Sequence, residues 1–343
     1  MRQLRKRNVG LQNKKFFMTS GKSLASIGGN QVNERLYLGV EIGGTKLQVV
    51  LGNENANILD RRRFQVDKAA GGAGIRNQIG QAIDDFEHKH RIAAIGIGFG
   101  GPIDWRTGKT ACSHHIEGWE DFDLVGWTRD HARVPVAVDN DANTAALAEA
   151  LKGAGSNSNP VFYVTLGSGV GGGLVVDGRI YHGAIPGEAE IGHIRLDKSG
   201  AIVEKRCSGW AVDERIRKAI ASEPGSKLAS LIGNTSGGEA GHLAKAIESG
   251  DALAIRIMDE TAEDLAFALS HVVHLTHPEM IILGGGLSLS GDVLQRAVEK
   301  HLPRFLMEAF KPGPQIRIAK LSEDVVTIGA LLLAKMVDTP GKS

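Results

Sequence analysis

The stretch LYLGVEIGGTKLQVVLG, residues 36–52, decides the fold, because two apolar runs rich in β-branched residues flank a Gly-Gly-Thr-Lys turn. No helix cap follows Lys46, so a second strand and a hairpin are expected instead of the helix that follows a phosphate-binding P-loop. Glycines let backbone N–H groups approach an anion and the lysine adds charge, which suggests phosphate. A plain tight turn at Gly43 and Gly44 is the alternative.

A second stretch, VFYVTLGSGVGGGLVVDGRIY at residues 161–181, repeats this design with an Asp-Gly hairpin turn near its end. Buried-strand runs that break into glycine occur at 91–104 and 278–288, each after helical apolar spacing at 75–87 and 252–275. The two halves therefore share an order of elements. Two glycine hairpins in corresponding places can face each other across a cleft and hold a polyphosphate from both sides.

Composition indicates two ordinary domains, since 343 residues with 42% hydrophobic content can supply two cores. The formal net charge is +1, so no global field favours nucleic acid or an acidic membrane as a partner. No run approaches the roughly 18 apolar residues of a membrane span. Two cysteines, Cys112 and Cys207, form neither a disulfide framework nor a CxxC pair, as in a reducing compartment. We expect a cytoplasmic protein with neither a membrane nor a nucleic-acid partner.

Residues 1–35 form a basic leader, whose first 30 residues contain no acid. A disordered tail is the first interpretation. A segment that contacts nucleic acid is the second interpretation. The third is that the leader is translated from a start codon upstream of the true one, for which Met18 is the next candidate.

Six motifs in order resemble the ROK family of sugar kinases and repressors, over residues 36 to about 335. They are VEIGGTKLQVV, GIGFGGPIDWRTG, VDNDANTAALAE, TLGSGVGGGLVVDGRIYHG, GEAEIGH and ILGGGLS. The resemblance implies a duplicated α/β fold of the two-lobed actin/hexokinase (ribonuclease H-like) type, with a cleft between the lobes. We expect residues 36–137 plus 322–343 to form the small lobe and 138–321 the large lobe, with 327–337 as a helix returning to the small lobe.

Asn140 and Asp141 lie where a strand ends and a helix begins, at the sheet edge where open α/β sheets place ligands. Phosphorylation of a sugar needs a carboxylate that accepts the hydroxyl proton. The resemblance implies that Asp141 is this general base and that Asn140 binds a sugar hydroxyl. The alternative is a helix N-cap, worth about 1 kcal/mol.

The segment GEAEIGHIRL supplies Glu190 and His193, and the resemblance assigns both to sugar binding. The alternative is a surface carboxylate and a buried structural histidine. Many relatives bind zinc through this histidine and three cysteines, but here Cys207 is the only thiol that follows, so no structural zinc is predicted. The same segment ends in the family with a sugar-binding glutamate, which Asp213 or Glu214 could replace.

The resemblance also implies a hexose substrate, ATP and Mg²⁺. Glu41 stands where the family usually has an aspartate near the metal, so it is a candidate Mg²⁺ ligand. Its side chain has one more methylene, which could slow catalysis or give a protein that binds sugar without turnover. The nucleotide would be held by the glycine turns, at Gly43, Gly44, Thr45, Lys46, Gly167, Ser168, Gly169, Gly285 and Gly286.

The sequence thus predicts an ATP-dependent hexose kinase, glucokinase-like, with glucose ahead of N-acetylated hexosamines and fructose. Two alternatives stay open. One is a sugar-responsive repressor, although only about 35 residues precede the first strand and a helix-turn-helix domain needs more. The other is a catalytically inactive sugar-binding protein of the same family. The oligomeric state is open, and a homodimer is one option.

Overall fold

The computed structural model describes residues 34–44, 46–111, 117–185 and 189–339. In this part the chain forms two five-stranded sheets with the same strand pattern. The basic leader therefore lies outside the described residues, apart from its last two positions. Residues 35–343 form one compact unit. No described helix is both long and apolar enough to cross a lipid bilayer.

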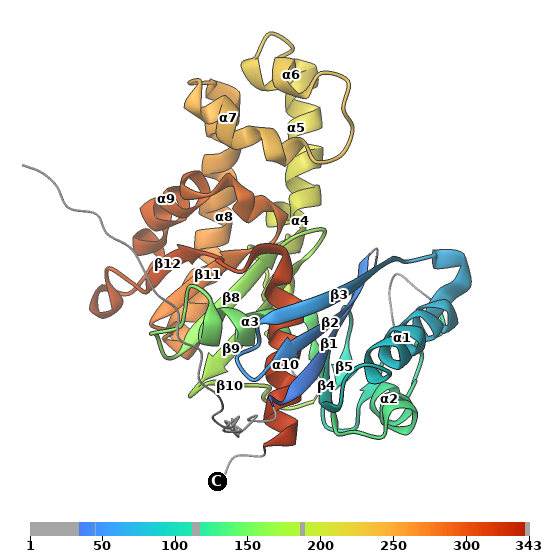
Figure 1. Ribbon diagram of the computed structural model, residues 1–343. Coiled ribbons are helices and arrows are strands. Elements are labelled where there is room, and N and C mark those ends of the chain that lie inside the picture. The colour runs from blue at the N-terminus through green and yellow to red at the C-terminus, as the bar shows by residue number, and fades with distance from the viewer. Residues whose placement is uncertain (1–33, 45, 112–116, 186–188, 340–343) are drawn as a thin grey trace, which may run out of the picture. The chain divides into compact units, whose positions relative to one another are not determined.

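The first sheet has the strand order β3-β2-β1-β4-β7 (Figure 1). Its first three strands pair antiparallel, whereas β1, β4 and β7 run parallel. The strands are β1 (Leu36–Ile42), β2 (Lys46–Asn53), β3 (Ile58–Gln65), β4 (Ile92–Phe99) and β7 (Val136–Asn140). The opening stretch of the sequence is therefore the expected hairpin, with Ile42 opposite Leu47. A short ribbon of β5 (Ile103–Asp104) and β6 (Lys109–Thr110) follows β4.

The second sheet has the order β10-β9-β8-β11-β12, with the same pattern of antiparallel and parallel pairs. The strands are β8 (Val161–Leu166), β9 (Val170–Val176), β10 (Arg179–Ile180), β11 (Met280–Gly284) and β12 (Gln315–Ile318). The turn before β10 has positive φ at Asp177 and Gly178, as an Asp-Gly hairpin turn requires. Strand by strand the second sheet repeats the first, which confirms the duplicated α/β fold.

Two helices at corresponding places pack between the sheets. They are α3 (Asp141–Lys152), which follows β7, and α10 (Val325–Asp338), which follows β12. The helix α10 packs on β1 and β4 of the first sheet, and α3 packs on β8 and β9 of the second (Figure 1). They meet where a Cβ at Gly329 would collide with the carbonyl oxygen of Thr144, so a glycine is required for this close crossing.

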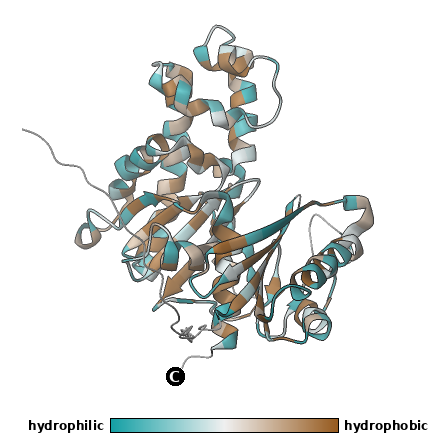
Figure 2. Cartoon of the chain, in the orientation of Figure 1, coloured by the Kyte–Doolittle hydropathy of each residue, from teal (hydrophilic) through white to brown (hydrophobic). Residues whose placement is uncertain are grey.

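Further helices cover the outer faces of the sheets. The first sheet is covered by α1 (Gly71–Glu87) and α2 (Leu124–Ala132), and the second by α8 (Ala252–Thr276) and α9 (Asp292–His301). The chain between β10 and α8 adds α4 (Glu204–Cys207), α5 (Gly209–Ser222), α6 (Lys227–Ile232) and α7 (Leu243–Glu248). Figure 2 shows hydrophobic residues concentrated in the strands and in the helix faces that pack on them.

The helices expected at 75–87, 252–275 and 327–337 are thus present as α1, α8 and α10. The strand β7 pairs with β4 as far as Asn140, so the first sheet extends slightly beyond residue 137, where we expected the small lobe to end. The lobe limits themselves stay a prediction.

Candidate active site

Asp141 is the first residue of α3, directly after the last residue of β7. The N-cap is Asn140, whose Oδ1 accepts hydrogen bonds from the backbone N–H groups of Ala142 at 2.8 Å and Asn143 at 3.4 Å. Since Asn140 satisfies these free N–H groups, the carboxylate of Asp141 is not needed as the cap. The capping alternative therefore holds for Asn140 and not for Asp141.

The environment of Asp141 suits a proton acceptor. Burial, helped by the negative charges of Glu41 and Glu190, raises the pKa of Asp141 to about 6, although the backbone N–H of Ala142 opposes the shift. A base is most effective when its pKa lies near the working pH. At neutral pH this carboxylate is largely ionised and holds a proton more tightly than an ordinary aspartate does.

A cavity of about 270 Å³ opens beside Asp141. One wall is the β8–β9 turn and the start of β9, and another is the β7–α3 junction. Two further carboxylates, Glu190 and Glu204, complete the lining. The full lining is Asn140, Asp141, Ala142, Thr165, Gly167, Ser168, Gly169, Val170, Gly171, Gly172, Glu190 and Glu204.

The turn of the first hairpin also reaches Asp141. A Cβ built at Gly100 would lie 3.4 Å from Oδ2 of Asp141, 3.4 Å from the Cα of Gly43 and 3.0 Å from the carbonyl oxygen of Ile42. The backbone N–H of Gly100 donates to that Ile42 oxygen at 2.7 Å. The loop after β4 therefore joins the first glycine turn to the catalytic candidate.

Glu41 and Lys46 pair with each other across the first hairpin. The Nζ of Lys46 lies 3.5 Å from Oε2 of Glu41 and also donates to the carbonyl oxygen of Glu323 at 3.3 Å. Gln48 donates to the same Glu41 oxygen at 2.7 Å. Burial raises the pKa of Glu41, while Lys46 and Gln48 oppose the shift. Lys46 does not line the cavity beside Asp141, and Thr45 lies outside the described residues.

The third glycine loop lies against the second hairpin. Gly285 has a positive φ of 79°, and a Cβ there would lie 2.5 Å from the backbone nitrogen of Leu166, so only glycine fits. Gly286 has open space around it, as does Gly167 in the β8–β9 turn. These open glycines leave backbone surface that a nucleotide phosphate could approach.

The residues expected to bind sugar divide into two groups. Asn140 and Glu190 line the cavity, whereas His193 is exposed at the end of a short 3₁₀ helix (Ile191–His193) and does not line it. The alternative of a buried histidine is thus wrong. The role of His193 in sugar binding stays a prediction.

Glu204 is the cavity residue that sequence reasoning missed. Its Oε2 accepts the backbone N–H of Val170 at 3.0 Å and lies 2.5 Å from the place where Gly169 would carry a Cβ. Only two acids, Asp197 and Glu204, lie between His193 and Asp213. Asp197 accepts hydrogen bonds from the backbone of its own loop, including Ser199 at 2.7 Å. The sequence narrows the choice to these two acids, and the contacts in the structure select Glu204.

Neither Asp213 nor Glu214 is available as the replacement that we considered. Asp213 is buried, and its carboxylate accepts the backbone N–H groups of Gly238 at 3.0 Å and Ala240 at 2.7 Å. Glu214 is exposed and forms an ion pair with Lys218 at 2.6 Å, one helical turn away. Both side chains serve local structure, and neither lines the cavity beside Asp141.

Cys207 is fully buried in the core under the second sheet. Burial raises the pKa of its thiol to about 12, so the thiolate that zinc requires is disfavoured. In the described part of the chain, no group of three or more His, Cys, Asp or Glu side chains is placed to hold a metal ion. Cys112 lies outside that part.

A duplicated two-sheet fold with a carboxylate at a strand end and glycine turns around it defines the actin/hexokinase-like class of phosphoryl-transfer proteins. The ROK family model matches residues 37–337, so the chain belongs to the ROK family. A glucokinase of Halalkalibacterium halodurans is 33% identical over 89% of this chain and 96% of its own length. A glucokinase of Thermotoga maritima is 28% identical over 87% and 96%.

A solved structure gives the same result. The crystal structure of a ROK family glucokinase from Streptomyces griseus in complex with glucose and AMPPNP matches with a TM-score of 0.75. It is 29% identical, and the match covers 88% of this chain and 99% of that one. The family resemblance and the fold class expected from the sequence are therefore confirmed.

Proposed function

We propose that this chain, a sugar kinase of the ROK family, transfers the γ-phosphoryl group of ATP to a hydroxyl of glucose, with Asp141 as the general base. The observation that carries the proposal is the pKa of Asp141, raised by burial to about 6 at the wall of a cavity that the second glycine turn also lines. Glucose is the first choice because the relatives named above are glucokinases.

The sugar would lie among Asn140, Glu190 and Glu204. Carboxylates accept hydrogen bonds from hydroxyl groups, and Nδ2 of Asn140, which donates to the carbonyl oxygen of Gly101 at 3.3 Å, has a second N–H for a sugar hydroxyl. Glu204 takes the role that we first sought at Asp213 or Glu214. His193 would contact the sugar only from the cavity's exposed side.

ATP would be held by backbone N–H groups of the glycine turns. Gly167, Ser168 and Gly169 line the cavity, and Gly286 has room for a ligand at the end of β11. Gly43 and Gly44 of the first hairpin would add further backbone N–H groups, and Thr45, which follows them in the sequence, lies outside the described residues. Lys46, paired with Glu41, would meet the phosphates by leaving or sharing that pair, because a phosphate competes with a carboxylate for an ammonium group.

The carboxylates of Glu41 and Asp141 suit a Mg²⁺ ion, which typically binds one or two protein carboxylates together with phosphate oxygens and waters. The negative charge of Glu41 contributes, after burial, to the raised pKa of Asp141. Bound Mg²⁺ supplies positive charge to the transferred phosphoryl group. Glu41 would hold the ion, while Asp141 would accept the proton of the attacking hydroxyl.

Closure of two lobes would exclude water from the reaction. The lobes would be residues 36–137 plus 322–343 and residues 138–321, with the boundary inside β7. A homodimer and a cytoplasmic location belong to the same proposal.

The test is ADP release by the purified protein with Mg-ATP against glucose, fructose, mannose and N-acetylated hexosamines. Turnover on glucose above the other sugars is the expected result. Sugar that raises the melting temperature without ADP release would instead identify a sugar-binding regulator or an inactive family member.

A further inference from the structure

The β7–α3 junction that presents Asp141 is held from behind by a buried carboxylate. Asp139 is only 3% exposed, and its Oδ1 accepts hydrogen bonds from the backbone N–H of Asn140 at 2.8 Å and from Nδ2 of Asn143 at 3.0 Å. These two residues flank Asp141 on the chain. A shift of Asp139 would therefore move the backbone on both sides of the catalytic candidate.

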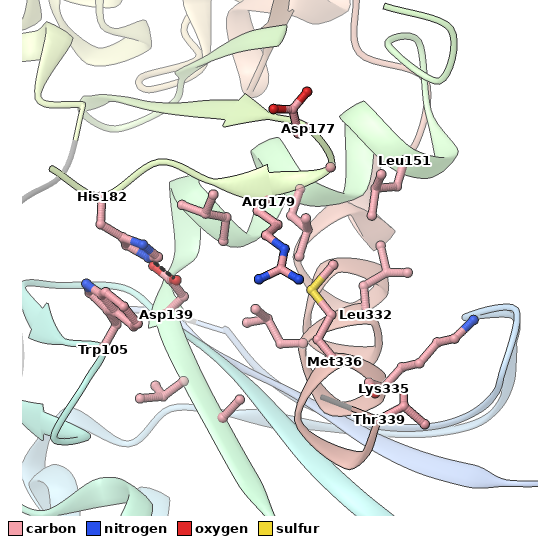
Figure 3. Close-up of a pocket in the computed structure, with 16 residues that line it drawn as sticks. Trp105, Asp139, Leu151, Asp177, Arg179, His182, Leu332, Lys335, Met336 and Thr339 are labelled. Carbon is pink, nitrogen blue, oxygen red and sulfur yellow. Dashed lines mark hydrogen bonds and ion pairs between the residues drawn. The ribbon is translucent and has the colours of Figure 1, made fainter. Parts of the chain in front are cut away.

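The second oxygen of Asp139 is bound by a residue from the other sheet. His182 follows β10, and its Nε2 donates to Oδ2 of Asp139 at 2.6 Å. A buried carboxylate oxygen without a partner is costly, so this bond adds to the two at Oδ1 in keeping Asp139 in place. Figure 3 shows the two side chains meeting at one end of a cavity of about 700 Å³ that both of them line.

The imidazole itself is held by an indole. Trp105, which follows β5, stacks on His182 with ring centroids 4.1 Å apart and planes at 15° (Figure 3). One ring face and one ring nitrogen of His182 are thus fixed by two different segments. The stacking and the hydrogen bond together orient Nε2 toward Asp139.

We propose that His182 is a positioning residue, which acts through Asp139 to hold the Asn140–Asp141 junction in the geometry that the proposed phosphoryl transfer needs. The inference rests on the proposed function for its kinetic consequence only. A displacement of about 1 Å at a reacting group can cost about 10²-fold in rate, so loss of this bond should reduce kcat.

The test compares two histidines in like surroundings. His182→Phe keeps a ring against Trp105 and removes the bond to Asp139. His131→Phe is the matched control, because His131 also stacks on an indole, Trp127, and also pairs with an aspartate, Asp84 at 2.9 Å, on the outer helices α1 and α2. His182→Gln, which keeps an amide donor, tests rescue.

Two readouts decide the inference. In ADP release with saturating ATP and sugar, His182→Phe should lower kcat by about 10-fold or more. His182→Gln should recover part of it, and His131→Phe should match the wild type. In hydrogen–deuterium exchange without ligand, the backbone amides of Ala142 and Asn143 should exchange faster in His182→Phe alone.

These readouts separate the two proposals. If the wild type releases no ADP with any sugar, the proposed kinase function fails, while the exchange rates still report on His182. Exchange at Ala142 and Asn143 equal in both phenylalanine variants would overturn the positioning role. The positioning role would also be overturned if the wild type is active and kcat falls no further in His182→Phe than in His131→Phe.

Discussion

Asp141 combines a fixed place with a raised proton affinity. Its neighbour Asn140 caps the helix, so the chain can form α3 without using the Asp141 carboxylate. Burial together with the charges of Glu41 and Glu190 raises the pKa of Asp141 to about 6. The proposed general base should therefore titrate within the ordinary working range of pH.

The pH dependence of kcat/KM follows from that pKa. A general base works only when deprotonated, so kcat/KM should fall as pH decreases through about 6, whereas an ordinary aspartate would titrate near 3.9. Initial rates between pH 4.5 and 8 with glucose measure the midpoint. A midpoint near 4 would mean that the base is another group or that Asp141 is solvated in the enzyme.

The sequence reveals some site residues and hides others for a physical reason. Asn140 and Asp141 are recognisable because a strand pattern runs directly into a helix pattern around them. Glu204 is not, because its role depends on a contact with Val170 from a distant segment and on no local spacing. The bond between Asp139 and His182 is equally long-range in the sequence, and nothing near either residue indicates it.

The helices α3 and α10 are the elements that connect the two sheets. Each follows the last strand of its own sheet, and they cross where Gly329 faces the carbonyl oxygen of Thr144. The glycine turns predicted both hairpins, apolar spacing predicted α1 and α8, and the family resemblance implied α10. The crossing itself could not be predicted, because helical periodicity specifies a buried face and not its partner.

The crossing makes Gly329 sensitive to substitution. Gly329→Ala should lower the free energy of unfolding by about 1–3 kcal/mol, because the new methyl group would force α10 away from α3. The control is Gly241→Ala, since Gly241 has no atom within 4 Å of its Cβ position and should stay within about 0.5 kcal/mol of the wild type. Urea unfolding followed by circular dichroism measures both. Equal stability of the two variants would contradict the close crossing.

The whole molecule is a duplicated unit whose two glycine hairpins occupy equivalent places, β1–β2 in one sheet and β8–β9 in the other. Duplication was predictable from the repeated order of hairpin, helix, strand and glycine loop. The short helices α4 to α7 break the symmetry, and the second sheet alone carries them. The Glu204 carboxylate comes from this insertion, so the added segment contributes to the cavity.

Sugar binding should stabilise the folded chain as a whole, because the cavity residues come from segments that meet only after folding. Glucose at 100 times its Kd should add about 2.7 kcal/mol of stability, seen as a higher melting temperature. Glu204→Gln should lose much of that shift at the same glucose concentration. Glu214→Gln should keep it, since Glu214 only pairs with exposed Lys218. Equal shifts in both variants would remove Glu204 from the sugar site.

The most direct test of the account is single-turnover transfer of the labelled γ-phosphoryl group from Mg-ATP to glucose, in the wild type and in Asp141→Asn. The account predicts labelled sugar phosphate with the wild type and a rate lower by about 10²–10⁴-fold in the variant, with glucose binding and fold retained. Transfer at an equal rate in the variant, or no label on the sugar with the wild type, would contradict it.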